Sequence, residues 1–411
     1  MKLNCLLIIT LFFSFYEVNA SDDTVSFKSV WAEFVSGDDN EKSFRFVDTM
    51  SQLETLAGNF PKHNMESYLP ESWNCVVSSD SNMVFLAGVL PYRMQQGRLI
   101  WILLSPENEM PARLFSHLLD VSVQQSFRPE LSSTQFAIDN KVYTSLVISN
   151  GTQELLSFPD VEVKLLFDQL TQSANDQRKE ELSHDIWERL SALLNQKELF
   201  RNPFKGYERM STLISPDGVV KICTWNIEYI NGDNAFFGGV TVHLNGNVRV
   251  FQLNDSYKSI RSPEQANLTA SRWYGCVYYD LLENRYRGDT FYTLLGYNGN
   301  TAFSKIRVVE ALTIAANGTP RFASAIFTDE RRSRRRLIFE YSNRASMMLR
   351  YDAGIRMIVM DNLAPIDNMF ENDFRYYGPD FSYNGLRFER GKWVWYDDVD
   401  LRNPAPPRRS R

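Results

Sequence analysis

Acidic side chains near the carboxyl end of the sequence are its best candidates for catalysis. The segment WYDDVD places Asp397, Asp398 and Asp400 directly after Trp393 and Trp395. Glycoside hydrolases use two carboxylates roughly 5–10 Å apart, often beside aromatic side chains that hold sugar rings. Acidic clusters also bind Ca²⁺, but DDVD lacks the spaced loop pattern of such sites. The three aspartates therefore indicate a carboxylate-dependent hydrolase of glycan or peptidoglycan only weakly, and a strand end with exposed acids is the simpler interpretation.

Other catalytic chemistries find little support. The four histidines stand at positions 63, 117, 184 and 243, and no HExxH, GxSxG, CxxC or P-loop motif occurs. His184 and Glu188 are one helical turn apart, yet no third metal ligand can be identified. Cys75 and His63 could form a nucleophile pair only if the fold brought them together. We expect no metal and no cofactor, and an enzyme is less favoured than a binding protein.

Aromatic residues gather between positions 376 and 396. In a strand, side chains alternate between two faces, so Trp393 and Trp395 share one face while Val394 and Tyr396 share the other. An exposed aromatic face is typical of a surface that binds protein or glycan. We therefore treat Trp393, Trp395 and Tyr383 as candidate binding residues. The alternative is that these rings fill a β-sheet core.

A run of arginines raises a separate question. The stretch TDERRSRRRLIFEYSN (328–343) lies between two strand-like segments, which places the arginines at a hairpin tip. Arg332, Arg334 and Arg335 are candidate contacts for anionic lipopolysaccharide or for the acidic patch of an envelope protein. The alternative is a solubilising turn that protects a sheet edge from pairing. Nucleic acid is not expected as a partner, because the chain carries an export signal.

That signal occupies residues 1–20, MKLNCLLIITLFFSFYEVNA. A basic start, a short apolar run and small residues before position 21 are typical of a secretory signal peptide. The apolar run is shorter than the roughly 20 residues of a membrane span, and no later segment is long and apolar enough to be one. We predict an exported soluble protein, periplasmic or extracellular, without a transmembrane segment after signal cleavage.

Composition indicates a globular protein, with 44% hydrophobic and 13% aromatic residues. Beyond the signal peptide the chain has three cysteines, too few for a disulfide scaffold. Cys223 and Cys276 are a candidate disulfide, and buried free thiols are the alternative. The net charge is −6, with acids in excess up to residue 200 and bases in excess after it. This asymmetry favours a domain boundary near 200.

The expected elements fit that boundary. Helical spacing predicts helices over 41–57 and 176–195, and apolar runs predict strands over 83–90 and 98–106. Residues 21–200 are thus expected to form a mixed α/β domain. Residues 201–403 read as short strands between Asn-Gly and related turns, with hairpins at 238–253 and 382–398. The fold class expected is α+β, with the second domain an antiparallel meander closed into a sandwich or barrel, followed by a basic Pro-rich tail at 404–411. An echo between 232–247 and 288–300 is a weaker sign of a propeller.

Five segments carry a resemblance to a known family: YTLLGYNGN (292–300), FEYSNRASMMLRYD (339–352), MIVMDNLAP (357–365), YYGPDFSYNGLRFERGKW (376–393) and DVDLRN (398–403). They resemble the C-terminal half of an uncharacterised family of exported proteins of Bacteroidetes-type bacteria. The resemblance implies a Gram-negative envelope location and brings no activity, ligand or site. The function predicted is an exported, non-catalytic protein that binds an envelope protein or anionic polymer, with the hydrolase as the alternative. Oligomeric state is not predicted.

Overall fold

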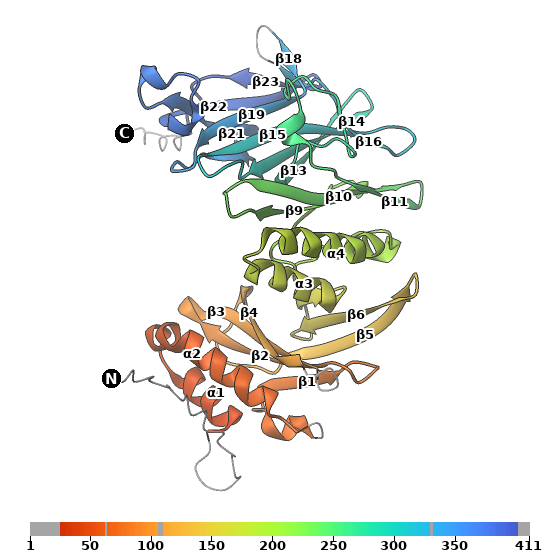
Figure 1. The fold of residues 1–411 in the computed structure, drawn as a ribbon, viewed down its shortest axis with the longest axis vertical. Coiled ribbons are helices and arrows are strands. Elements are labelled where there is room, and N and C mark those ends of the chain that lie inside the picture. Colours follow the sequence, from red (N-terminus) through yellow and green to blue (C-terminus); the bar gives the residue numbers. More distant parts are fainter. Residues whose placement is uncertain (1–24, 62–63, 106–109, 329–331, 402–411) are drawn as a thin grey trace, which may run out of the picture. The chain divides into compact units, whose positions relative to one another are not determined.

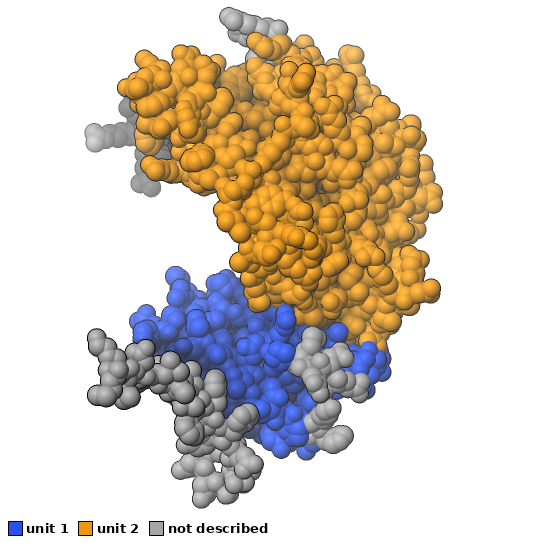
Figure 2. Space-filling view, viewed as in Figure 1, with its two compact units in different colours: residues 1–132, 148–155 blue, residues 133–147, 156–411 orange. Residues whose placement is uncertain are grey.

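The structure is a computed structural model that describes residues 25–61, 64–105, 110–328 and 332–401. The expected signal peptide (1–20) and basic tail (404–411) lie outside the described residues. Contacts divide the chain into two compact units, Met1–Ser132 with Ile148–Leu155, and Ser133–Val147 with Leu156–Arg411 (Figure 2). These units are defined by contacts alone. That residues 21–200 and 201–403 fold as separate domains stays a prediction.

The first unit packs two helices on an antiparallel sheet (Figure 1). The helices are α1 (Phe27–Ser36) and α2 (Asp39–Gly58), and the sheet has the order β1 (Trp73–Val77), β2 (Val84–Tyr92), β3 (Gln96–Ser105) and β4 (Met110–Ser122). Asp38 caps α2 by accepting from the amides of Asn40 and Glu41. Trp73 lies in the core, where its ring forms T-shaped pairs with Phe27 and Trp31 at centroid distances of 4.9 and 5.0 Å.

A three-stranded sheet, β5 (Glu130–Ile138), β6 (Lys141–Ser149) and β7 (Glu154–Phe158), contains the points where the chain passes from one unit to the other. The sequence did not reveal these strands. The segment ELSSTQFAI of β5 is rich in hydroxyl and amide side chains, and no residue of it is fully buried. It therefore lacks the apolar alternation by which a half-buried strand is recognised.

The second unit contains two helices, α3 (Val161–Gln172) and α4 (Asp176–Leu194), that cover a four-stranded sheet. Its strands are β8 (Ser211–Ile214), β9 (Val220–Glu228), β10 (Asn234–Leu244) and β11 (Asn247–Gln252). Trp225 of β9 donates its indole N–H to Ser183 of α4 at 3.4 Å. Trp187 of α4 lies so close to Gly239 that a Cβ there would be 2.5 Å from its ring. Glycine at this position therefore lets the helix approach the sheet.

Two further sheets complete the second unit, and Figure 1 shows them stacked in succession on the first. One contains β12 (Leu268–Thr269), β13 (Val277–Tyr286), β14 (Asp289–Asn298), β15 (Ser304–Ile314), β16 (Pro320–Phe322) and β19 (Arg336–Ser342). The other contains β17 (Phe327–Thr328), β18 (Ser333–Arg334), β20 (Leu349–Asp352), β21 (Met357–Pro365), β22 (Tyr377–Glu389) and β23 (Lys392–Tyr396). One apolar core contains side chains of the first two sheets, and a second contains side chains of the last two.

The echo noticed in the sequence falls on equivalent turns of neighbouring sheets. Gly232 turns the chain from β9 to β10, and Gly288 turns it from β13 to β14. The two Asn-Gly-Asn segments likewise follow β10 and β14. In the β10–β11 hairpin both Asn245 and Gly246 have positive φ, 53° and 79°, as a type I′ turn requires. The sequence repeat therefore marks a repeated three-strand meander.

The expected α+β fold class is wrong. Among the described residues, 47% are in strands and 22% in helices, and antiparallel sheets occur throughout the chain. Two of the four helices in the described part, α3 and α4, belong to the second unit, so helices are not confined to a mixed first domain. The second unit also differs from the expected closed sandwich or barrel, because it contains three successive sheets. No helix among the described residues combines the length and apolar character needed to cross a bilayer.

Residues 195–209, which span the domain boundary expected near 200, pack into the second unit. Phe200, Phe204 and Tyr207 are buried there. The ammonium group of Lys221, on β9, donates to the carbonyls of Leu199 and Asn202 at 3.0 and 2.7 Å. This irregular segment is therefore anchored by its buried rings and by a buried lysine.

Candidate functional site

One surface pocket of the second unit lies where three turns meet. We call it the aromatic pocket, and its volume is about 660 Å³. The turns follow β14 and β19 and join β21 to β22. The lining residues are Ala302, Phe303, Ser342, Asn343, Arg344, Ala345, Ile366, Arg375, Tyr376, Tyr377 and Gly378.

Hydrogen bonds fix one wall of the aromatic pocket. The backbone N–H of Asn343 donates to the carbonyl of Phe303 at 2.9 Å. The side-chain amide of Asn343 donates to the carbonyl of Ala302, also at 2.9 Å. Lys305 donates in turn to the carbonyl of Asn343 at 2.9 Å. These bonds join the turns after β14 and β19, so the turn that carries Phe303 has a fixed backbone.

Ring packing fixes the opposite wall. Tyr376 stacks on Phe370 with ring centroids 4.0 Å apart, and Phe374 lies 5.0 Å from Tyr377. Arg375 makes a two-point contact with Asp373, at 2.8 and 2.6 Å. Such bidentate pairs hold a guanidinium in a defined direction. Both walls are therefore formed before any partner arrives.

The chemistry of the aromatic pocket is apolar and cationic. Phe303 and Ile366 are 65% and 74% exposed, and Tyr376 is 37% exposed. Arg344 is exposed and forms no ion pair within the described part of the chain. No carboxylate, histidine or cysteine is among the lining residues. The pocket can therefore hold an apolar group beside a negative charge, but its own side chains offer no general base or nucleophile.

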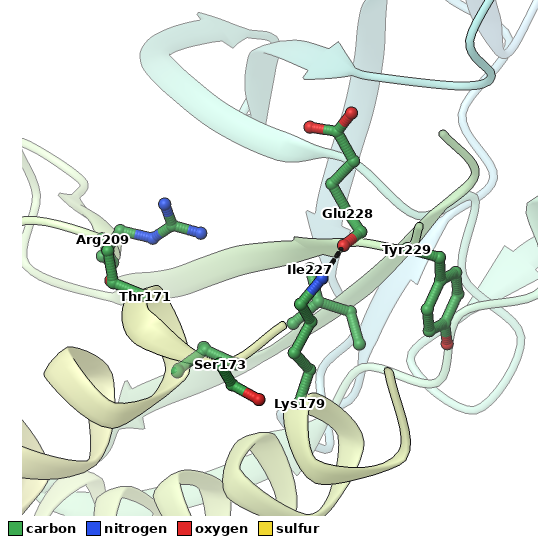
Figure 3. Close-up of a pocket in the computed structure, with 8 residues that line it drawn as sticks. Thr171, Ser173, Lys179, Arg209, Ile227, Glu228 and Tyr229 are labelled. Carbon is green, nitrogen blue, oxygen red and sulfur yellow. Dashed lines mark hydrogen bonds between the residues drawn. The ribbon is translucent and has the colours of Figure 1, made fainter. Parts of the chain in front are cut away.

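A smaller, polar pocket of about 260 Å³ lies between the helices and the first sheet of the same unit (Figure 3). Its lining residues are Leu170, Thr171, Ser173, Lys179, Arg209, Ile227, Glu228 and Tyr229. Lys179 donates to the backbone carbonyl of Glu228 at 2.6 Å, which is the dashed contact in Figure 3. Its ammonium is therefore already bound to the protein.

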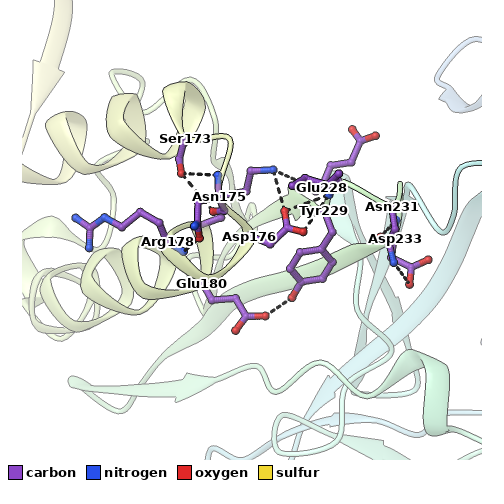
Figure 4. A network of polar contacts seen from close by, with 11 residues as sticks. Ser173, Asn175, Asp176, Arg178, Glu180, Glu228, Tyr229, Asn231 and Asp233 are labelled. Atoms are coloured by element: carbon purple, nitrogen blue, oxygen red, sulfur yellow. Dashed lines mark hydrogen bonds and ion pairs between the residues drawn. The ribbon is translucent and has the colours of Figure 1, made fainter.

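The contacts around the polar pocket join α4 to the β9–β10 turn (Figure 4). The carboxylate of Asp176 accepts the amide of Ile230 at 3.1 and 3.2 Å. The hydroxyl of Tyr229 donates to Glu180 at 2.5 Å. Burial, together with this bond to Glu180, raises the pKa of Tyr229. The network holds the start of the helix against the sheet, so we interpret it as structural.

The three candidate catalytic acids do not converge on a pocket. Asp397, Asp398 and Asp400 are exposed after the end of β23, and none of them lines either pocket described above. Asp397 accepts the indole N–H of Trp395 at 2.8 Å. Among the described residues, no group of three or more His, Cys, Asp or Glu side chains could hold a metal ion.

The two tryptophans share one face of β23, and that face is directed into the core. Trp393 is 1% exposed, and its indole N–H donates to Thr293 at 2.8 Å. Trp395 is half-buried against Phe339, with ring centroids 6.3 Å apart. The prediction that Trp393 contacts a partner is therefore wrong, because its side chain is almost completely buried. A binding role for Trp395 and for half-buried Tyr383 stays a prediction.

Several side chains of the arginine run form contacts within the protein. Arg336 is fully buried, pairs with Glu310 at 2.6 Å and donates to the carbonyls of Pro263, Ala266 and Phe322. Arg335 donates to Asn267, and Arg334 lies 3.4 Å from Glu264. These three side chains thus hold the 263–267 loop, while Arg332 is exposed. Anion binding by Arg332, Arg334 and Arg335 stays a prediction, and Arg331 lies outside the described residues.

The remaining candidates are the two cysteines of the possible disulfide and the histidine pairs. Cys223 and Cys276 are free, buried thiols, so the candidate disulfide is absent and the alternative of buried thiols is correct. Burial raises the pKa of both thiols. Glu188 pairs with Lys141 at 2.5 Å, so its carboxylate is not directed to a shared metal with His184. His63 lies outside the described residues, which leaves its pairing with Cys75 a prediction.

Sequence reasoning found only part of the aromatic pocket. Tyr376 and Tyr377 belong to the aromatic-rich segment singled out above, but Phe303 and Arg344 were missed. Both lie in turns, one after Asn298-Gly299-Asn300 and one in SNRAS. An exposed aromatic or arginine in a turn is a signal of binding that could have identified them.

Comparisons with known proteins leave the family open. No protein-family model matches the chain, and no curated protein matches it. An endo-arabinase from Bacteroides thetaiotaomicron aligns over 78% of this chain and 95% of its own, with 10% identity and a TM-score of 0.21. An exo-1,5-α-L-arabinanase from a bovine ruminal metagenomic library aligns over 60% and 75%, with 10% identity and a TM-score of 0.19. Similarity this low establishes neither a shared fold nor a shared activity.

Proposed function

We propose that this protein is an exported, non-catalytic binding protein that holds an envelope protein or polymer at the aromatic pocket. The observation that carries the proposal is the lining of that pocket. It combines exposed Phe303, Ile366 and Tyr376 with Arg344, and it includes no acid or base. Exposed aromatic side chains around a cation are typical of recognition surfaces.

The preformed walls support the same conclusion. Ring stacking holds the side chain of Tyr376, and a hydrogen bond holds the backbone of Phe303, so binding does not have to order these groups. Each immobilised side chain would otherwise cost about 0.5–1.5 kcal/mol of the binding free energy. The group expected in the pocket is apolar and carries, or lies beside, a negative charge that Arg344 can meet.

Calorimetric titration tests this function on the whole chain. The probes are purified lipopolysaccharide, acidic polysaccharides, and proteins captured from envelope extract by the tagged chain. Tyr376→Ala and Arg344→Ala should each weaken binding of the retained partner by about tenfold or more. Phe44→Ala removes an equally large ring that is 90% exposed on α2, outside the pocket, and should leave binding unchanged.

The same envelope preparations test whether the protein is a hydrolase. Release of reducing ends from envelope glycans should be absent in the wild-type protein. Asp397→Asn and Asp398→Asn keep the side-chain shape but remove its charge and basicity. If the wild type hydrolyses glycans and either variant does not, the protein is a hydrolase and the non-catalytic function is wrong. Unchanged binding in both pocket variants would remove the aromatic pocket from the proposal.

A further inference from the structure

Phe381 lies in a distorted part of β22, and its side chain projects into solvent. Phe381 is 92% exposed, more than any other large apolar side chain described. Its φ is +70°, in the left-handed region that phenylalanine rarely adopts. A non-glycine residue there costs about 1–3 kcal/mol, and such strain concentrates at functional positions. Folding alone would favour Gly or Asn at this position.

The distortion is a β-bulge built by specific contacts. Along the β21–β22 pair, Asp361 faces Tyr383 but Leu363 faces Pro379, so residues 380–382 lie opposite a single residue, Asn362. Bulges of this kind redirect a side chain. The bulge is therefore what turns the ring of Phe381 toward solvent.

Side-chain hydrogen bonds keep the bulge in one shape. The carboxylate of Asp380 accepts both the backbone N–H and the hydroxyl of Ser382, at 2.9 and 2.7 Å. It also accepts from Asn362 at 2.8 Å, and Asn362 accepts from Asn384 at 2.9 Å. The exposed ring thus stands on a rigid base, which lowers the entropic cost of using it as an anchor.

The aromatic pocket is large enough for this ring and carries charge of the opposite sign to Asp380. A cavity of about 150 Å³ is enough to take up a benzene ring, and this pocket has about 660 Å³. Phe381 is not among its lining residues, so the ring does not occupy the pocket of its own chain. Asp380 stands beside the ring, whereas Arg344 and Arg375 stand at the pocket.

We propose that Phe381 of one copy inserts into the aromatic pocket of a second copy, where Asp380 meets Arg344. The inference rests on the proposed function, because it names the partner of that same pocket. The contact joins two different surfaces of identical chains. It therefore forms either a closed ring of copies or an open chain, in which each copy gives a ring and receives one.

Sedimentation velocity on the purified full chain tests the contact. The wild type should associate as its concentration rises to about 100 µM, the range of a weak specific complex. Phe381→Asn removes the ring but suits the left-handed backbone, and Arg344→Glu reverses the charge at the pocket. Each variant alone should weaken association by at least tenfold, whereas the matched Phe44→Ala variant should associate like the wild type.

Mixing the two variants gives the decisive result. Phe381→Asn retains a working pocket and Arg344→Glu retains a working ring, so an equimolar mixture should form 1:1 complexes that do not grow further. Thermal melting controls for folding: Phe381→Asn should melt at or above the wild-type temperature, because the backbone strain is relieved. A stable fold with lost association therefore separates anchoring from structure.

Three outcomes would overturn the inference. They are a monomeric wild type at the highest concentration, wild-type association by Phe381→Asn, and equal effects of Phe381→Asn and Phe44→Ala. Binding of the wild type but not Phe381→Asn to phosphatidylglycerol vesicles, without self-association, would assign the ring to a lipid surface instead. If the wild type is monomeric while Tyr376→Ala still loses its envelope partner, the self-association fails and the proposed function stands.

Discussion

Replacing Glu310 with glutamine would show what the buried ion pair contributes to the second unit. Glu310 and Arg336 are both fully buried, and their side chains meet at 2.6 Å. The other carboxylate oxygen of Glu310 accepts the hydroxyl of Tyr278 at 2.5 Å. That hydroxyl already accepts the indole N–H of Trp273 at 2.8 Å. A glutamine amide in place of this oxygen would donate toward Tyr278, so the network would lose an acceptor as well as a charge.

The expected cost follows from the environment. Removing one partner of a buried pair costs about 3–5 kcal/mol, because the remaining charge is left without compensation. Arg336 keeps its bonds to three backbone carbonyls, so we expect Glu310→Gln to lie near the lower end of that range. At about 2–4 °C per kcal/mol for a domain of this size, Tm should fall by roughly 10 °C.

Urea unfolding of a double-mutant cycle measures the coupling directly. The cycle compares Glu310→Leu, Arg336→Met and the double variant, which fills the same space without charge. The double variant should be more stable than the sum of the single effects predicts, by about 1–3 kcal/mol. Arg334→Ala breaks a partly exposed contact with Glu264 and should cost about 1 kcal/mol or less. Additive single effects, with coupling below about 0.5 kcal/mol, would refute the reasoning.

Two further predictions concern buried side chains. Trp393→Ala should destabilise the protein by about 3–5 kcal/mol, because it leaves a cavity in the core and removes the hydrogen bond to Thr293. Trp395→Ala should cost clearly less, because Trp395 is only half-buried. Equal urea midpoints for the two variants would contradict this ranking. Burial lowers the pKa of Lys221 to about 8 from 10.5. Above pH 8 the folded chain therefore releases a proton that the unfolded chain keeps, so stability should rise with pH up to about 10.5. Lys221→Met should remove most of that rise between pH 7 and 9.5, and parallel stability curves for the two proteins would show that Lys221 does not titrate in this range.

The local signals in the sequence predicted several elements well. Helices α2 and α4 were expected over 41–57 and 176–195, and the hairpin over 238–253 is confirmed by β10 and β11. Long periodic segments and Asn-Gly turns are the patterns that tertiary contacts override least. The strands β2 and β3 were also found, because their continuous apolar runs are fully buried.

Elsewhere tertiary contacts outweighed the local signal. Among the Asn-Gly pairs that were read as turns between strands is Asn384-Gly385, but both residues lie inside β22. Asn384 is buried and donates to Asn362, while a Cβ on Gly385 would be 2.5 Å from the side chain of Met357. This pair of residues therefore allows β22 to pack closely against β21 and does not form a turn. Equally, no local pattern could show that the turns carrying Phe303 and Tyr376 meet, because their separation in the chain is long.

The buried Arg336 also sets an order of events during folding. Its contacts with Pro263 and Ala266 span 73 and 70 residues of chain. Contacts between such distant residues raise the contact order, because the entropy of closing the long loop is lost before the contacts are gained. While the chain is being synthesised, the 263–267 loop emerges long before residue 336 and lacks its clamp until β19 has paired. A strand that is made about 70 residues later is therefore needed to complete this loop, so the loop should become fully resistant to unfolding only after β19 has been synthesised.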